Sequence, residues 1–260
     1  ALPISWMGWL MVVSGGCVIG IGSTEHFAPQ SLWKCFAFKY DYINQSLVWV
    51  RTFEQANFHF DIFRSDIKEL PGSGNYLIHS QNRFSYAQSM QLVLDKTTGD
   101  VLSAMGFGEI NTTIGMKKMV RAGQQFFSVG YRIGSTPHAG TLLSARDAGG
   151  QLLWTREYTA PQTSLYAFYL THLNNHLYLL SDGTDTSRYF VVTKTDLYGQ
   201  PQWSRRVDLP FNTLLTNGKT ISAVGNDLIV TLNDVSADRC WLYKFNEDGQ
   251  LIWSRVMEMP

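Results

Sequence analysis

Four arginines in this chain each follow a tryptophan by two residues, and a ring of such arginines would bind an anion. Residues two apart on a strand share one face, so each pair could instead pack, with the arginine stacked on the tryptophan of a neighbouring unit at about 0.5–2 kcal/mol. We expect packing rather than an anion site. The residues given this structural role are Trp49, Trp154, Trp203, Trp253, Arg51, Arg156, Arg205 and Arg255.

Metal ligands are sparse. His172 and His176 are the closest pair of histidines, and no Cys, His or carboxylate lies near enough in sequence to complete a zinc site. The segment 181–186 has the composition of a calcium loop but lacks the distal glutamate of an EF-hand. We therefore predict no metal site, and a solvated loop between two strands at 181–186.

No nucleophile has the neighbours it needs. The sequence has no G-x-S-x-G, and no Ser, His and Asp that spacing alone would bring together. The glycines at 72–74 belong to a turn, because no helical pattern follows them as a phosphate loop requires. We predict no catalytic residue, no cofactor-binding residue and no cofactor, and hence a protein that is not an enzyme.

The tryptophans instead mark a repeat. Trp154, Trp203 and Trp253 recur at intervals of about 50 residues, and Trp49 lies two units before Trp154 with Ser103 at the degenerate position between them. Each unit has four β-like runs. A turn with Asp or Asn at its start and Gly near its end precedes the fourth run, at 95–100, 147–150, 196–199 and 246–249. We expect the Asp or Asn to cap the turn and the Gly to take the left-handed conformation.

This pattern predicts an all-β protein, a β-propeller of about five four-stranded antiparallel blades. We expect one domain over residues 1–260. Its blades are predicted at approximately 4–56, 57–110, 111–161, 162–210 and 211–260.

Composition narrows the function classes. The 260 residues include 21 Lys and Arg and 21 Asp and Glu, so the net charge is zero and no basic face is indicated for a nucleic acid. The uncharged stretch 4–22 is long enough to span a membrane, but its glycines and its place in the repeat favour a buried β-hairpin. Cys17, Cys35 and Cys240 form no paired framework, and we expect buried thiols.

The D-x-x-x-G turn followed by a strand with Trp resembles the repeats of quinoprotein-like (PQQ-like repeat) β-propellers. The segment 95–100 is the nearest match, followed by 147–154, 196–203 and 248–253. The resemblance implies that the tryptophans pack between adjacent blades. That family includes quinone dehydrogenases and cofactor-free scaffolds, and it implies an extracytoplasmic location, in the periplasm, cell envelope or secreted fraction.

The scaffold type agrees better with the lack of catalytic signatures. We therefore predict a non-catalytic interaction module with a protein partner, of undetermined oligomeric state. Exposed loop aromatics would anchor that partner, namely Phe27, Phe84, Tyr86 and Tyr131. Two alternatives stay open: an enzyme with its active site at the propeller channel, quinone-dependent or sugar-acting, and a glycan-binding module.

Overall fold

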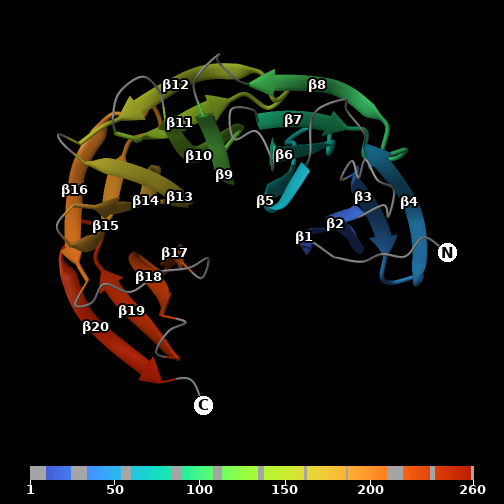
Figure 1. Ribbon diagram of the computed structural model, residues 1–260. Helices are drawn as coiled ribbons and strands as arrows, with labels where there is room; N and C mark the ends of the chain where they lie inside the picture. Colours follow the sequence, from blue (N-terminus) through green and yellow to red (C-terminus); the bar gives the residue numbers. More distant parts are fainter. Residues whose placement is uncertain are drawn as a thin grey trace, which may run out of the picture. The chain divides into compact units, whose positions relative to one another are not determined.

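The computed structural model describes residues 10–24, 34–53, 60–82, 89–107, 113–133, 138–160, 163–185, 187–209, 219–234 and 238–258. These residues form twenty strands in five four-stranded antiparallel sheets and contain no helix (Figure 1). The predicted all-β class and the four-stranded unit are confirmed, and every sheet lies within one of the predicted units.

The strands follow one another in chain order within each sheet. The first sheet contains β1 (Leu10–Ser14), β2 (Cys17–Thr24), β3 (Lys34–Asp41) and β4 (Ser46–Phe53). The second contains β5 (Phe60–Glu69), β6 (Tyr76–Asn82), β7 (Ser89–Leu94) and β8 (Val101–Phe107). The third contains β9 (Thr113–Ala122), β10 (Gln125–Ile133), β11 (Gly140–Arg146) and β12 (Leu152–Tyr158). The fourth contains β13 (Ser164–Leu173), β14 (His176–Thr184), β15 (Arg188–Thr195) and β16 (Pro201–Asp208). The fifth contains β17 (Lys219–Val224), β18 (Asp227–Asp234), β19 (Arg239–Phe245) and β20 (Leu251–Glu258).

The turn before each fourth strand has the predicted chemistry. Oδ1 of Asp196 accepts hydrogen bonds from the N–H groups of Tyr198 and Gln200 at 2.9 and 2.8 Å, and Asp95, Asp147 and Asn246 cap their turns in the same way. The glycine of each turn has a positive φ. The values are +75° at Gly99, +86° at Gly150, +74° at Gly199 and +77° at Gly249.

By their internal contacts, the residues divide into two compact units. One comprises Ala1–Phe126 with Ala145–Leu153, and the other comprises Phe127–Ser144 with Trp154–Pro260. The division falls within the third sheet, so sheets one and two belong to the first unit and sheets four and five to the second. A single domain over the whole chain stays a prediction.

Each unit has its own hydrophobic core. In the first, the core joins the first two sheets through side chains such as Ile19, Ile67 and Leu94, all less than 2% exposed. In the second, Phe190 and Val192 of β15 pack with Val230 and Phe245 of the fifth sheet. The core of the second unit therefore occupies one face of β15, which leaves the opposite face of that strand for another use.

The uncharged N-terminal segment forms a hairpin where it is described, because β1 and β2 pair antiparallel. No helix among the described residues is long and apolar enough to cross a membrane. Cys17 and Cys240 are free thiols, and Cys240 is buried. The side chain of Cys35 lies outside the described residues.

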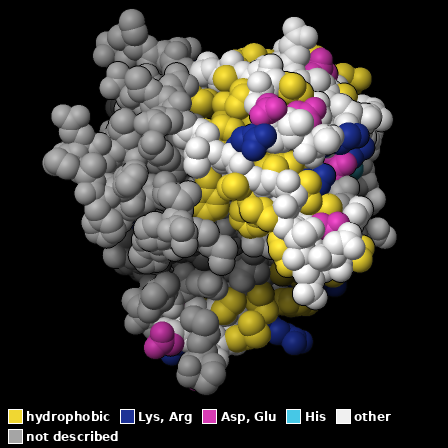
Figure 2. All heavy atoms as spheres, turned by 90° about the vertical axis from the view of Figure 1, so that its right-hand side faces the viewer, with side chains coloured by type: hydrophobic (Ala, Val, Ile, Leu, Met, Phe, Trp, Pro, Cys, Tyr) yellow, Lys and Arg dark blue, Asp and Glu magenta, His cyan; other side chains and the backbone are white. Residues whose placement is uncertain are grey.

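Hydrophobic side chains also reach the surface on the fourth strand of several sheets. On β4, Leu47, Val48 and Val50 are exposed, and Figure 2 views the side of the molecule on which β4 lies, where hydrophobic side chains intermix with charged ones. β8, β12 and β20 begin with exposed aliphatic residues as well. β16 differs, because it begins with Pro201 and Gln202.

Candidate functional site

Three of the tryptophans in the W-x-R pairs, Trp49, Trp154 and Trp203, lie against the turn of the following sheet. A β-carbon added to Gly99 would lie 2.7 Å from the Trp49 ring, and one added to Gly249 would lie 3.0 Å from the Trp203 ring. Trp49 Nε1 donates to the carbonyl oxygen of Lys96 at 3.3 Å. In the turns of Gly99, Gly199 and Gly249 the glycine is therefore required for two reasons, its positive φ and its missing side chain.

A lysine lies opposite three of the four tryptophans, and Lys39 and Lys194 add to the same contact between one sheet and the next turn, here called the seam; β11, which precedes the strand of Trp154, contains no lysine. Sequence reasoning gave these lysines no role. Lys39 pairs across the strands with Trp49, Lys194 with Trp203 and Lys244 with Trp253. Lys39 Nζ donates to the carbonyl oxygen of Lys96 at 3.0 Å, the same oxygen that receives the indole N–H of Trp49. Lys194 and Trp203 likewise donate to the carbonyl oxygen of Glu247. The signal was the recurrence of lysine in the third strand.

The arginines of the pairs stack on tryptophan, but on that of their own strand. The guanidinium carbons of Arg156, Arg205 and Arg255 lie 5.8, 6.0 and 5.2 Å from the centre of the tryptophan ring two residues before each. Arg51 instead pairs with Asp100, and Arg156 also donates from Nε to the carbonyl oxygen of Tyr198 at 2.6 Å. The expected stacking on the ring of a neighbouring unit is wrong for these three arginines, since residues two apart on one strand already reach each other.

Between the second and third sheets the seam is built differently. Ser103 stands where the tryptophan would be, and its cross-strand partner is Val93 rather than lysine. A β-carbon on Gly150 would lie 3.5 Å from Val93, which is an ordinary contact distance. The carbonyl oxygen of Gly150 accepts from Nη1 of Arg146, which comes from the strand before the turn.

The face of the fourth sheet opposite Trp203 carries a different set of side chains. On β15 and β16, Val191 pairs with Arg206 and Thr193 with Ser204, so these four share one face. The hydroxyl groups of Thr193 and Ser204 are 3.0 Å apart. This face is polar because the apolar residues of β15 point to the fifth sheet.

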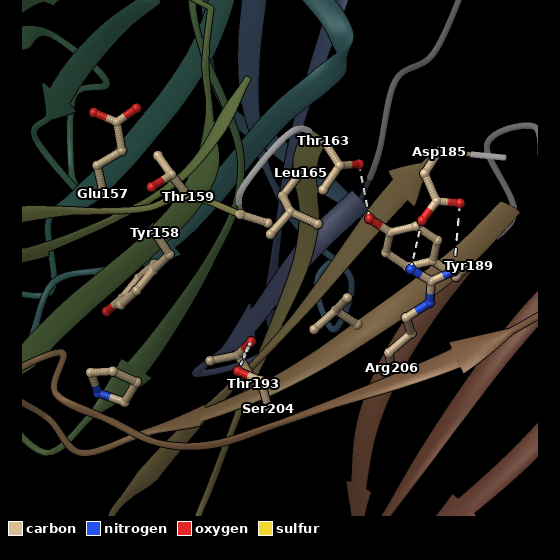
Figure 3. A pocket seen from close by; sticks show the side chains of 13 residues that line it. Glu157, Tyr158, Thr159, Thr163, Leu165, Asp185, Tyr189, Thr193, Ser204 and Arg206 are labelled. Carbon is tan, nitrogen blue, oxygen red and sulfur yellow. Dashed lines mark hydrogen bonds and ion pairs between the residues drawn. The ribbon is translucent and has the colours of Figure 1, made fainter. Parts of the chain in front are cut away.

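A pocket of about 790 Å³ opens on this polar face. It lies between β15 and β16 on one side and the end of β12 with the chain that follows on the other (Figure 3). Its lining is Glu157, Tyr158, Thr159, Ala160, Thr163, Leu165, Asp185, Tyr189, Val191, Thr193, Pro201, Ser204 and Arg206. All of these residues belong to the second unit. The volume is in the range of small-molecule sites in proteins.

One end of the pocket is an ordered ion cluster around Arg206. Nη1 of Arg206 lies 2.6 Å from Asp185, Nη2 lies 2.6 Å from Asp208, and the guanidinium carbon lies 3.7 Å from the centre of the Tyr189 ring. Thr163 hydrogen-bonds the Tyr189 hydroxyl at 2.9 Å, as Figure 3 shows. These contacts fix the orientation of the guanidinium.

The cluster sets the charge state of its members. The hydrogen bond from Arg206, followed by that from the Ser187 N–H, lowers the pKa of Asp185 to about 2. The hydrogen bonds from Asp185 and Asp208 raise the pKa of Arg206 above its usual range. Asp185 is therefore ionised and Arg206 protonated throughout the neutral range.

Tyr158 and Glu157 form the other end of the pocket. The Tyr158 hydroxyl donates to the carbonyl oxygen of Gly199 at 2.7 Å, and burial raises the pKa of that phenol, which keeps it protonated as a donor. The Glu157 carboxylate pairs with Arg132 at 3.1 Å. In Figure 3 Glu157 and Asp185 lie at opposite ends of the view.

Sequence reasoning missed this pocket, although the repeat contains a signal for it. The residue after the arginine of each W-x-R pair differs between units, being Thr52, Glu157, Arg206 and Val256. Glu157 and Arg206 both line the pocket. The position that varies within a constant packing frame is thus the one that carries polar groups into the site.

The predicted solvated loop at 181–186 is wrong in its first part. β14 continues to Thr184, Ser181 is buried, and Asp182 forms an ion pair with Lys219 of β17. Gly183 is part of this strand. The ring of its cross-strand partner Tyr189 covers it and leaves no room for a β-carbon, which explains the glycine at this position. Thr186 lies outside the described residues.

The histidine pair flanks a tight turn. His172 and His176 lie on β13 and β14, and Nδ1 of His176 is 3.5 Å from Glu247. Burial, followed by the charge of His176, lowers the pKa of His172. Across the described ranges, no three His, Cys, Asp or Glu side chains are grouped so as to hold a metal ion.

Of the aromatic anchors expected for a protein partner, only Tyr131 lies among the described residues. Tyr131 is a strand residue with 7% exposure, and its ring packs on those of Tyr166 and Phe168 at 5.4 and 6.1 Å. Its predicted exposure is wrong because neighbouring aromatic rings cover it. Phe27, Phe84 and Tyr86 lie outside the described residues.

Comparison with known proteins gives a fold and no family. No family model and no curated protein matches the sequence. Among solved structures, the chain is similar to a GH43 β-1,3-galactosidase, with 9% identity, a TM-score of 0.51 and 93% of this chain covered against 53% of that one. It is also similar to an α-L-arabinofuranosidase from Clostridium thermocellum, with 11% identity, a TM-score of 0.52 and coverage of 95% and 92%.

A third similar structure is a subtype N10 neuraminidase-like protein of A/little yellow-shouldered bat/Guatemala, with 9% identity, a TM-score of 0.50 and coverage of 78% and 59%. The chain spans little more than half the length of this protein and of the galactosidase. These structures are β-propellers, and the predicted propeller fold is thereby confirmed.

The comparisons also correct the predicted function. The similar structures bear the names of enzymes or enzyme-like proteins, which speaks against the predicted non-catalytic protein-binding scaffold. The prediction was wrong because it took the lack of local catalytic motifs as evidence that the folded protein has no site with polar and charged groups. A propeller assembles its polar groups from several strands, and the pocket here draws on β12, β15 and β16, between which no local spacing exists to detect.

Proposed function

We propose that the pocket between β12 and the polar face of β15 and β16 binds a carbohydrate. One observation carries this proposal: a single pocket combines the ring of Tyr158 with hydroxyls on its floor and an ionised carboxylate at one end. Carbohydrates present hydroxyl groups around a ring with apolar C–H faces. A site for them therefore needs fixed donors and acceptors beside an aromatic surface.

The polar groups of the pocket are ordered before any ligand arrives. Thr193 and Ser204 hold each other at 3.0 Å, and Arg206 is held by Asp185 and Asp208. A hydroxyl can both donate and accept, while an ionised carboxylate accepts from two neighbouring hydroxyls. Little side-chain entropy is then lost on binding, because these groups already occupy one arrangement. The names of two similar structures, a galactosidase and an arabinofuranosidase, support a carbohydrate over other polar ligands.

A second candidate is glycoside hydrolysis in the same pocket, favoured by the presence of two carboxylates there. Glycosidases use one carboxyl group as an acid and another as a base or nucleophile. Asp185 has the low pKa of a base or nucleophile. Glu157 would have to carry the proton, yet Arg132 pairs with its carboxylate form. Binding is therefore the first candidate, and hydrolysis the second.

The chain contains a matched pair of variants that tests binding. Ser204 and Ser254 occupy the same place in the repeated segment W-S-R, and both are exposed, but only Ser204 lines the pocket. We expect Ser204→Tyr to fill the pocket and to weaken carbohydrate binding about tenfold or more, and Ser254→Tyr to leave it unchanged. Binding is measured by calorimetry against a panel of di- to tetrasaccharides, with near-ultraviolet circular dichroism to establish that both variants are folded.

Equal binding by the two variants would refute the pocket as the site. Hydrolysis is tested on the same panel by detecting released sugar. Turnover that Asp185→Asn and Glu157→Gln each abolish, while binding persists, would favour the second candidate.

The quinoprotein-like repeat and the extracytoplasmic location remain part of this proposal through the sequence resemblance alone. Neither is needed by the pocket. A carbohydrate ligand outside the cytoplasm agrees with both, and fractionation of the source cells with detection of the native protein tests the location.

A further inference from the structure

We infer that the pocket selects neutral carbohydrates and rejects those that carry a carboxylate, an inference that rests on the proposed function. The charged side chains of its lining are Glu157, Asp185 and Arg206. A carbohydrate acid needs a cation that is free to meet it. Arg206 could bind a carboxylate of the ligand only if protein groups did not already neutralise its charge and occupy its N–H donors.

Two carboxylates of the protein already bind the guanidinium of Arg206. Nη1 faces Asp185 at 2.6 Å, Nη2 faces Asp208 at 2.6 Å, and Nε donates to Asp208 at 2.8 Å. The flat side of the guanidinium covers the Tyr189 ring at 3.7 Å. Two carboxylates thus surround one cation, so the cluster carries a net negative charge and its fork of donors is already used.

The opposite end of the pocket gives no compensation. Glu157 and Arg132 form a pair at 3.1 Å, which brings no net positive charge to the lining. A carboxylate entering the pocket would meet the negative cluster and would have to displace Asp185 from Arg206 to gain a partner. The new pair would at best replace the one that is broken, while the like charges of Asp208 and the displaced Asp185 would still oppose the ligand.

A neutral carbohydrate meets the same groups favourably. Its hydroxyls can donate to the carboxylate of Asp185, which lines the pocket, and can both donate to and accept from Thr193 and Ser204. No ion pair needs to break. The same residues that exclude an acid therefore accept a polyhydroxylated neutral ring.

The test compares matched neutral and acidic probes on the full chain. We would titrate galactobiose against digalacturonate and lactose against sialyllactose, within a wider panel of neutral di- to tetrasaccharides, by calorimetry. We expect at least one neutral probe to bind, and its acidic counterpart to bind about tenfold more weakly or not at all. Asp208→Asn is the diagnostic variant, because Asp208 lies outside the pocket lining and its loss frees one side of Arg206.

In Asp208→Asn we expect the preference for the neutral probe to shrink severalfold, since Arg206 can then accept a second anion. Acidic probes that bind the wild type as tightly as neutral ones, in a manner that Ser204→Tyr abolishes, would overturn the inference and leave the carbohydrate site standing. Absence of binding across the whole panel would overturn the proposed function, and the inference with it.

Discussion

The contact between one sheet and the next turn is built in one way where a tryptophan is present and in another way where Ser103 takes its place. The side chains that donate to the turn come from the preceding sheet in the first case and from the turn's own sheet in the second. Where Trp49 or Trp203 is present, the preceding sheet sends an indole and a lysine to a carbonyl oxygen in the next turn. Where Ser103 is present, Arg146 reaches the carbonyl of Gly150 from the strand that leads into that same turn. The two designs therefore satisfy different carbonyl groups of the turn: that of the residue after the capping Asp or Asn at the tryptophan seams, and that of the glycine at the Ser103 seam.

The difference shows which part of the seam tolerates change. At the Ser103 seam, Ser103 and Val93 stand where the tryptophan and the lysine would be, and a side chain from the strand before the turn supplies a donor to another of its carbonyl groups. Near Gly150 the neighbouring side chains are Val93 and Leu77, which lie 3.5 and 3.7 Å from a β-carbon built on that glycine, rather than an indole. A degenerate repeat is thus a repacked one.

The largest effect should follow from removing an indole. Trp49 is 5% exposed, so Trp49→Ala leaves a cavity and takes one donor from the carbonyl of Lys96. We expect the free energy of unfolding to fall by about 3–5 kcal/mol, whereas Ser103→Ala should change it by less than about 0.5 kcal/mol. Urea denaturation measures both. Similar losses in the two variants would show that the two seams do not differ as described.

Acid should act on the Ser103 side through His79. This histidine is 1% exposed, and burial, followed by the charges of Arg146 and Lys117, lowers its pKa from 6.5 to about 3. The unfolded chain then binds a proton that the folded chain does not, so stability is lost as the pH falls below 6.5 and continues to be lost until it nears 3.

The measurement is the free energy of unfolding as a function of pH, for wild type and His79→Gln. We expect the wild type to lose more stability than the variant between pH 6.5 and about 5, a range above the ordinary titration of carboxylates. Parallel curves for the two proteins would mean that His79 is not held neutral by its surroundings.

A smaller contrast is expected between two glycines with nearly the same φ. In Gly199→Ala the new methyl group would lie 2.6 Å from Arg156 and 2.8 Å from Trp154, and the residue would also keep a φ of +74°. In Gly150→Ala only the strained φ of +86° remains. We expect losses of about 2–4 kcal/mol and about 1–2 kcal/mol respectively. Thermal unfolding of the pair isolates the contribution of the tryptophan seam, and a larger loss at Gly150 would contradict it.

The smallest effect concerns the arginines. Arg51 and Asp100 form a pair at 3.0 Å with side chains 42% and 64% exposed, so solvent screens the attraction. We expect Arg51→Ala to cost less than about 1 kcal/mol, and less at high salt. Denaturation at two salt concentrations checks this. A loss as large as that of Trp49→Ala would assign the arginine a role that its exposure does not support.

The sequence predicts the fold well because the turns are local. Asp196 and Gly199 lie within four residues of each other, and their hydrogen bonds and φ follow from their own chemistry. The role of the seam lysines was harder to predict. Each donates to the backbone carbonyl of a residue about 50 positions away, and because every residue has such a carbonyl, the identity of that residue gives no signal. The pocket was missed for a related reason. Glu157 and Arg206 come to line one pocket only when separate strands are placed. Tyr131 shows the converse, because it was assigned to an exposed loop and is a buried strand residue.

The seam at the tryptophans has a consequence for how such a chain can grow. The fourth unit holds both halves of the connection. Lys194 on β15 and Trp203 on β16 serve the turn of the unit after it, and the turn that contains Gly199 lies against Trp154 of the unit before it. A gene duplication that copies one whole unit would therefore supply both halves at once, without a new interface having to arise by mutation. Later divergence is then free at the position after the arginine, where Thr52, Glu157, Arg206 and Val256 already differ. The packing is inherited by copying, and the chemistry is acquired one residue at a time.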